Sequence, residues 1–170
     1  MRTIWIVCLL WACGKGGDGI DKGATESSGG VKKVKEAELQ LNTLAKKAKV
    51  VFAETGKFPV GTAKVLPART AEYKDMGGCC GSKSSGDTVD NKCPVSKEWA
   101  GDPVWKVLAF SIDEPSNYRY KYESADGTSF TATAAGDADC DGDEATYVLK
   151  GTAANGTPTV ELVQPPKGKY

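Results

Sequence analysis

The stretch VKKVKEAELQLNTLAKKAKVVFAETG (residues 31–56) decides the fold, because it predicts one long amphipathic helix. Its apolar residues recur at steps of three and four, which places them on one side of a helix. They are Val34, Ala37, Leu41, Leu44, Ala48, Val51 and Phe52. Lysine and glutamate side chains, Glu36 among them, fill the remaining faces. Because a helix with one apolar stripe is marginal alone in water, we expect the rest of the chain to cover that stripe.

The second half of the chain predicts the covering surface, since apolar and polar residues alternate there as they do in strands. The expected strands are residues 117–123, 128–134, 146–150 and 159–163. Asp126-Gly127 and Asn155-Gly156 are tight-turn pairs, and connections this short require antiparallel pairing. The expected fold class is therefore α+β, with a long N-terminal helix packed on a four-stranded antiparallel meander.

The charge balance and the missing histidine exclude several classes of function. Lysine plus arginine and aspartate plus glutamate each number 22, so no net field favours binding to nucleic acid. The chain has no histidine, which rules out a Ser-His-Asp triad, a Cys-His dyad and any zinc site with a histidine ligand. Carboxylate pairs such as Asp113 and Glu114 remain, but nothing in the sequence positions them for catalysis. We expect a protein that is not an enzyme.

The first residues predict export. Arg2 precedes an apolar run, TIWIVCLLWA at residues 3–12, which is typical of a secretory signal and is too short to span a membrane. The run continues into LWAC at residues 10–13, which resembles the bacterial lipobox, although Trp11 replaces the usual small residue. The resemblance implies cleavage before Cys13 and attachment of lipid to its sulfur. An ordinary signal peptide followed by an incidental cysteine is the alternative.

The chain divides into four predicted parts. Residues 1–12 form the lipoprotein signal peptide, and residues 13–30 form the lipidated Cys13 with a flexible tether in which seven of the seventeen remaining residues are glycine. Residues 31–166 form the globular domain, and residues 167–170 form a polar tail. We therefore expect a protein of the bacterial cell envelope, held at the outer membrane or cell surface by a lipid on Cys13.

The expected globular domain contains four cysteines, which are Cys79, Cys80, Cys93 and Cys140. An even number of cysteines in an exported chain predicts disulfides. Adjacent Cys79 and Cys80 would close a strained ring with each other, so we expect one of them to pair with Cys93 and the other with Cys140. A four-cysteine zinc site is the alternative, although adjacent cysteines lack the C-x₂-C spacing of such sites.

The run DADCDGDE at residues 137–144 carries carboxylates at every second position around a glycine. This pattern resembles the first half of an EF-hand loop, in which alternate carboxylates converge on calcium. The candidate calcium ligands are Asp137, Asp139, Asp141 and Asp143. The twelfth loop position would be Val148 rather than the glutamate that an EF-hand requires. A solvated acidic turn is the alternative, and no cofactor other than calcium is expected.

The order of parts and several runs of residues resemble type IV pilins and pseudopilins. Residues 36–61 look like the solvent-side helix of bacterial pilins, which ends in a Gly-x-Phe-Pro segment. The later runs resemble the sheet of pilin-like proteins from deltaproteobacteria. They are WKVLAF at residues 105–110, the alternating Tyr118, Tyr120 and Tyr122, and FTATAAGD at residues 130–137. The resemblance covers roughly residues 35–165.

This resemblance implies a pilin-like globular domain, and some pseudopilins bind calcium in their strand–loop region. Pilins also carry a prepilin peptidase site and about 20 apolar residues that anchor them in the membrane. A lipobox and a glycine-rich segment stand in that place here.

We therefore expect a lipid-anchored, surface-displayed protein that acts in adhesion or as an accessory component related to type IV pili or type II secretion. Its expected partners are a membrane, other pilins and cell-surface ligands. Two alternatives stay open. One is a type IV pilin subunit proper, and the other is a small-ligand or glycan-binding module that uses the face of Tyr118, Tyr120 and Tyr122.

Overall fold

The structure is a computed structural model that describes residues 28–68, 79–80 and 92–167, with the side chains of the first helix described from Glu36 onward. The helical elements are α1 (Ser28–Thr55), η2 (Trp99–Gly101) and α2 (Pro103–Leu108). The strands are β1 (Gly61–Thr62), β2 (Arg119–Ser124), β3 (Ser129–Gly136), β4 (Ala145–Ala154) and β5 (Thr157–Val163). The predicted signal peptide, Cys13, most of the tether and most of the polar tail lie outside the described residues.

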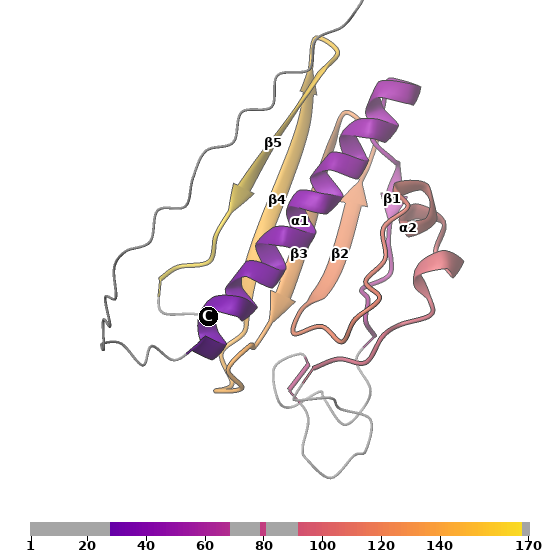
Figure 1. The fold of residues 1–170 in the computed structure, drawn as a ribbon. Coiled ribbons are helices and arrows are strands. Elements are labelled where there is room, and N and C mark those ends of the chain that lie inside the picture. The colour runs from indigo at the N-terminus through magenta and orange to yellow at the C-terminus, as the bar shows by residue number, and fades with distance from the viewer. Residues whose placement is uncertain (1–27, 69–78, 81–91, 168–170) are drawn as a thin grey trace, which may run out of the picture.

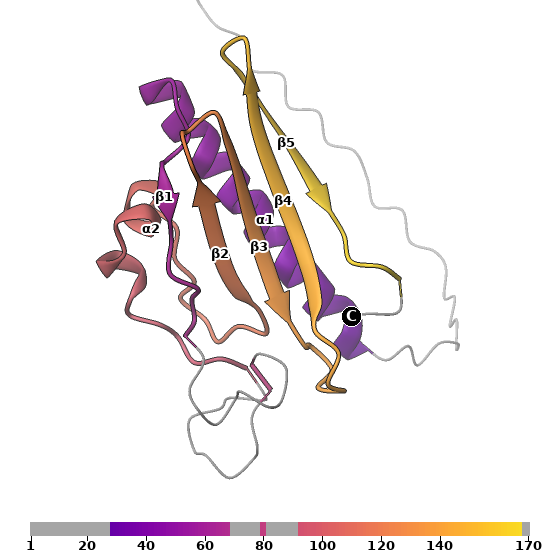
Figure 2. The same cartoon turned by 180° about the vertical axis from the view of Figure 1, so that it is seen from behind.

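The strands form one sheet with the order β1-β2-β3-β4-β5, and every neighbouring pair is antiparallel. α1 lies across one face of this sheet and runs along the direction of the strands (Figure 1). The view from behind shows the opposite face of the sheet, over which no described helix passes (Figure 2). The fold therefore has two layers, with the core between α1 and the sheet.

The fold class expected from the sequence is wrong. We expected an α+β fold with a long helix on a four-stranded meander, whereas the described fold is mostly β, a five-stranded sheet on which one helix segment packs. The missed strand is β1, which pairs Gly61 with Ser124 and Thr62 with Glu123. A strand of two residues is too short to show the alternation by which strands are recognised.

The four other strands lie where the alternating pattern predicted them, but β3 and β4 are longer than expected. β3 continues to Gly136, and β4 runs from Ala145 to Ala154. The additional residues are mainly alanine, glycine and threonine, which give little contrast between an apolar and a polar face. They join the sheet because each one pairs with a neighbouring strand.

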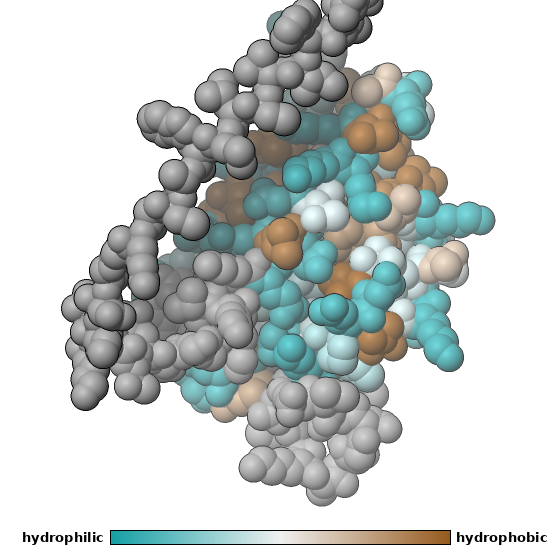
Figure 3. Space-filling view, viewed as in Figure 1, coloured by the Kyte–Doolittle hydropathy of each residue, from teal (hydrophilic) through white to brown (hydrophobic). Residues whose placement is uncertain are grey.

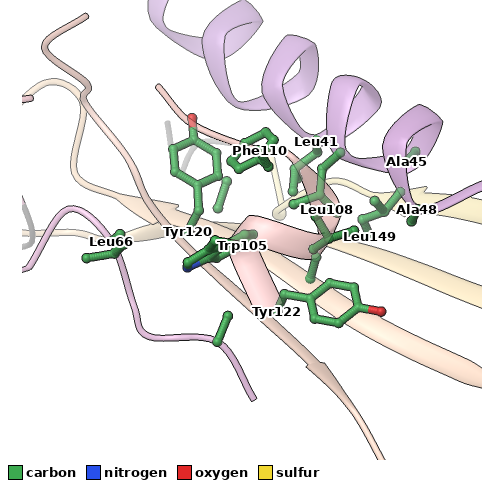
Figure 4. Packing of buried hydrophobic residues seen from close by; sticks show 14 of the residues in the cluster. Leu41, Ala45, Ala48, Leu66, Trp105, Leu108, Phe110, Tyr120, Tyr122 and Leu149 are labelled. Carbon is green, nitrogen blue, oxygen red and sulfur yellow. The ribbon is translucent and has the colours of Figure 1, made fainter. Parts of the chain in front are cut away.

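The apolar stripe of α1 faces the sheet, as predicted. Leu41 and Leu44 are fully buried, and burial of each such side chain contributes about 2 kcal/mol. The other buried stripe residues are Ala37, Ala48 and Phe52, while Val51 is half-buried and the side chain of Val34 is not among those described. The sheet and α2 supply the opposing surface, in which Trp105, Leu108, Phe110 and Leu149 lie under α1 (Figure 4).

The short helix α2 begins at a strong cap. The Asp102 carboxylate accepts hydrogen bonds from the backbone N–H groups of Val104 at 2.9 Å and Trp105 at 3.0 Å, with Pro103 at the first helical position. A third bond comes from the backbone N–H of Lys64 at 2.9 Å. Burial alone would raise the pKa of Asp102, but these three N–H groups hold the pKa below its ordinary value.

The aromatic side chains that accompany α2 belong to the core. Trp99, Trp105 and Phe110 are each no more than 3% exposed, and their ring centroids lie 5.2–5.6 Å apart. The indole N–H of Trp105 donates to the backbone oxygen of Lys64 at 2.8 Å. These rings therefore hold α2 against the sheet rather than offering a stacking surface to a ligand.

Exposed apolar side chains are dispersed over the surface. On the face that carries α1, hydrophobic residues form separate groups among hydrophilic ones (Figure 3). Leu39 and Val50, the most exposed of the large apolar residues, lie eleven positions apart on α1, which corresponds to about 16 Å. None of the described helices combines the length and the apolar character needed to cross a membrane.

We predict that Gly151→Ala destabilises the protein by about 1–3 kcal/mol. A Cβ atom at Gly151 would lie 1.9 Å from Cε1 of Phe130. That ring cannot move aside easily, because it is packed between Phe58 at 4.8 Å and Tyr122 at 5.2 Å. Urea unfolding with the disulfides intact measures the loss.

The matched control is Gly101→Ala, since a Cβ atom there meets nothing within 4 Å. We expect this variant to stay within about 0.5 kcal/mol of the parent protein. Equal free energies of unfolding for the two variants would show that Phe130 is not held as tightly as its ring contacts indicate.

Candidate functional site

The candidate site is the acidic turn, residues 137–144, which connects β3 to β4. β3 ends at Gly136. Only glycine fits at this position, because a Cβ atom would lie 2.2 Å from the backbone oxygen of Asn117. The turn then uses two residues in the left-handed region, Cys140 with φ 62° and Gly142 with φ 97°. It returns the chain to Ala145, which pairs with Gly136.

Asp137 is the buried centre of the acidic turn, with 2% of its surface exposed. Its carboxylate accepts hydrogen bonds from the backbone N–H groups of Asp141 at 3.2 Å and Gly142 at 2.8 Å. Burial raises the pKa of Asp137, the Gly142 N–H opposes that rise, and the neighbouring carboxyl of Asp139 adds to it. The charged form of Asp137 is therefore less favourable than that of an exposed aspartate, and a bound cation would offset this cost.

Three of the four predicted ligands come together in the structure. Carboxylate oxygens of Asp137, Asp139 and Asp141 lie within 4.8 Å of one another. Calcium takes oxygen ligands at about 2.3–2.6 Å, so oxygens on opposite sides of one ion are roughly 5 Å apart. These three carboxylates can therefore reach a single calcium ion.

The remaining part of the EF-hand comparison does not hold. Asp143 is outside the group of three, and it donates its backbone N–H to the Asp141 carboxylate at 2.8 Å. Val148 lies half-buried within β4, paired with Thr133 and Val163. The acidic turn is thus a compact turn at the end of two strands rather than half of a helix–loop–helix site.

Two disulfides are present, as predicted, and they join Cys79 to Cys93 and Cys80 to Cys140. The alternative of a zinc site built from these four cysteines is therefore wrong. Cys140 lies within the acidic turn, so the second disulfide ties that turn to the segment around Cys80. Cys13, the predicted lipidation residue, lies outside the described residues.

Sequence reasoning missed the role of Glu36, which we expected on the solvent side of the helix. Its carboxylate accepts hydrogen bonds from the Ser116 hydroxyl at 2.6 Å, the Asn117 backbone N–H at 3.0 Å and the Asn117 side-chain amide at 2.7 Å. Nothing local in the sequence signals this contact, because its partners are about eighty positions away.

These features gather at one end of the molecule, which we call the cysteine end. It comprises the N-terminal end of α1, the acidic turn and both disulfides (Figures 1 and 2). Glu36 contacts Asn117, whose backbone oxygen packs against Gly136, and Ser116 exchanges backbone hydrogen bonds with Cys93 at 2.8 and 3.0 Å. The acidic turn is therefore positioned by α1, by the segment of Ser116 and Asn117 and by the disulfides, in addition to its own hydrogen bonds.

The three tyrosines that the sequence suggested as a ligand-binding face do not lie on the molecular surface. Tyr118, Tyr120 and Tyr122 are each 0% exposed, and burial raises the pKa of all three hydroxyls. The Tyr122 hydroxyl donates to the backbone oxygen of Pro59 at 2.9 Å. Phe110 lies against Tyr120, and Trp105 lies against Tyr122, so a glycan cannot reach these rings. Asp113 and Glu114, the carboxylate pair considered for catalysis, are both exposed.

Comparison of the chain with protein-family models, with curated proteins and with solved structures gives no match. The likeness to pilins and pseudopilins therefore stays a prediction from the residues quoted above.

We predict that calcium stabilises the acidic turn. At 1 mM calcium and a dissociation constant of about 0.1 mM, the gain is about 1.4 kcal/mol, which corresponds to a rise in Tm of roughly 3–6 °C. Thermal unfolding of one sample in calcium and in chelator measures the shift.

The double variant Asp139→Asn, Asp141→Asn should lose the shift, because two of the three converging carboxylates are removed. Asp113→Asn is the matched control, since it neutralises an exposed carboxylate that is not one of the three converging ones and should keep the shift. A parent protein that melts at the same temperature in calcium and in chelator would rule out the site.

Proposed function

We propose that this protein is a non-enzymatic, lipid-anchored module of the bacterial cell envelope, displayed at the outer membrane or cell surface. It works as an adhesive or accessory component related to type IV pili or type II secretion. Its partners are other pilins or ligands on cell surfaces.

The observation that carries this proposal is the pair of disulfides at the cysteine end. All four of their cysteines are among the described residues, and Cys79, Cys80 and Cys93 are each 1% exposed. Structural disulfides persist in oxidising compartments outside the cytoplasm. They agree with the export signal that the apolar run of residues 3–12 predicts.

The sequence before α1 supports the anchor. Cys13 follows the lipobox-like run directly, and α1 begins at Ser28. The chain between these two positions is rich in glycine and contains one large apolar residue, Ile20. Such a composition suits a spacer between a lipid and a folded body. A single acyl chain binds membranes only marginally, whereas a fully lipidated cysteine carries several.

The adhesive or accessory role is supported by two features. The likeness of residues 35–165 to pilin-like proteins points to machines that work at the cell surface. Tyr118, Tyr120 and Tyr122 are buried in the core, which removes the surface on which the alternative glycan-binding module relied. A display function places the recognition surface on the exposed turns and strands of the body instead.

We predict that Cys13→Ser releases the protein from the membrane fraction, because the only sulfur in the lipobox-like run that can be acylated is lost. Fractionation of cells and mass spectrometry of the mature N-terminus measure the outcome. Cys8→Ser is the matched control, since Cys8 lies inside the apolar run and should leave both the anchor and the fractionation unchanged. Recovery of the parent protein with an unmodified Cys13 thiol would refute the anchor.

The accessory role makes a separate prediction. Pilus fibres sheared from cells should contain this protein at far less than one copy per fibre subunit, because the chain has a lipobox-like run where pilins carry the apolar stem that packs the fibre. Quantitative mass spectrometry of the sheared fraction measures the ratio. A stoichiometric amount would instead identify a pilin subunit proper.

A further inference from the structure

We infer that the cysteine end faces the lipid headgroups and that the opposite end of the body faces outward. This inference rests on the proposed anchor at Cys13. The opposite end, which we call the turn end, comprises Gly56, the β2–β3 turn and the β4–β5 turn (Figures 1 and 2).

The two ends are separated by the full length of the fold. α1 has 28 residues and begins at the cysteine end, so its two termini lie about 42 Å apart. At the turn end, the Phe58 N–H just beyond α1 donates to the backbone oxygen of Gly127 at 2.9 Å. That bond joins the chain after the helix to the β2–β3 turn. The helix therefore runs from one end of the molecule to the other.

The length of chain before α1 limits how the folded domain can be oriented relative to the bilayer. Cys13 and Ser28 are fifteen positions apart, and fifteen residues reach at most about 54 Å when fully extended. For the turn end to touch the bilayer, those residues would have to run about 42 Å back along the body, which uses most of that reach. Contact through the cysteine end demands no such extension, so it is favoured by chain entropy.

Among the described residues of that end, the acidic turn carries a group of exposed carboxylates. Asp139, Asp141, Asp143 and Glu144 are all exposed in the acidic turn. Glu144 is paired with Arg119 at 3.2 Å, which leaves the excess negative charge on the aspartates. Anionic headgroups repel these carboxylates over a distance of about 8 Å at physiological ionic strength. The cysteine end should therefore approach a neutral bilayer more closely than an anionic one.

Energy transfer from a fluorophore on the protein to a fluorophore on the lipid surface tests the orientation. The mature lipidated chain is reconstituted in neutral phosphatidylcholine vesicles, with the donor on an unnatural residue at Thr146 or at Thr157, so that the cysteines are untouched. Both positions are exposed. Thr146 is the second residue of β4, at the cysteine end, and Thr157 is the first residue of β5, at the turn end. They are separated by about 26 Å along β4.

We expect several-fold more efficient transfer from Thr146 than from Thr157. Anionic vesicles should lower the transfer from Thr146, and the triple variant Asp139→Asn, Asp141→Asn, Asp143→Asn should abolish that dependence on lipid charge. Asp126→Asn, in the β2–β3 turn, is the matched control and should keep it.

The outcomes separate this inference from the proposed function. A chain that does not associate with vesicles at all overturns the anchor, and the orientation with it. Association with equal transfer from both positions, or with more transfer from Thr157, leaves the anchor standing and overturns the orientation. Transfer from Thr146 that ignores lipid charge overturns the role given to the acidic turn.

Discussion

The fold depends on the apolar contact between one side of α1 and the aromatic face of the sheet. Neither layer is stable without the other, because a single helix is marginal in water and an uncovered sheet would expose its tyrosines. Leu41 and Leu44 are the buried leucines of the helix, and the core continues to β2 through Trp105 and Phe110, which contact Tyr122 and Tyr120. Aromatic side chains bury about 150–250 Å² each, so a few rings replace a larger aliphatic core.

Disulfides and hydrogen bonds hold the chain together at the cysteine end, beyond the apolar contact. At the cysteine end, the residues around Cys79 and Cys80 include several glycines and few large apolar side chains. The two disulfides close loops of 14 and 60 positions, for which loop-closure entropy gives about 3 and 4 kcal/mol. The Cys80–Cys140 disulfide fixes one residue of the acidic turn, and within that turn Asp137 is buried beside the carboxyl of Asp139.

Secondary-structure features that depend on local periodicity or on a local cap can be predicted from the sequence. The stripe of α1 was found because helical spacing selects its residues. The start of α2 is a signal of the same local kind, since Asp102 and Pro103 form its cap within adjacent positions. The disulfide partners could be narrowed to two arrangements, since adjacent cysteines cannot easily pair with each other. Each of these inferences uses residues that are close together in the sequence.

Features that depend on distant neighbours were missed. β1 is a strand only because Gly61 and Thr62 pair with β2, and its two residues carry no pattern of their own. Asp143 was grouped with the other aspartates by spacing alone, whereas the three converging carboxylates are those of Asp137, Asp139 and Asp141. Glu36 reads as a solvent-facing residue until Asn117 is placed beside it.

The position of Glu36 also has a mechanical meaning. Its three hydrogen bonds hold α1, eight positions after the helix begins at Ser28, to the segment that leads into β2. A tensile force applied to the N-terminus of this helix would act lengthwise, and a lengthwise load strains these bonds and the buried stripe simultaneously. Contacts loaded in parallel yield at higher force than contacts peeled apart in turn. The helix is thereby suited to bear tension at the end where the chain enters the fold.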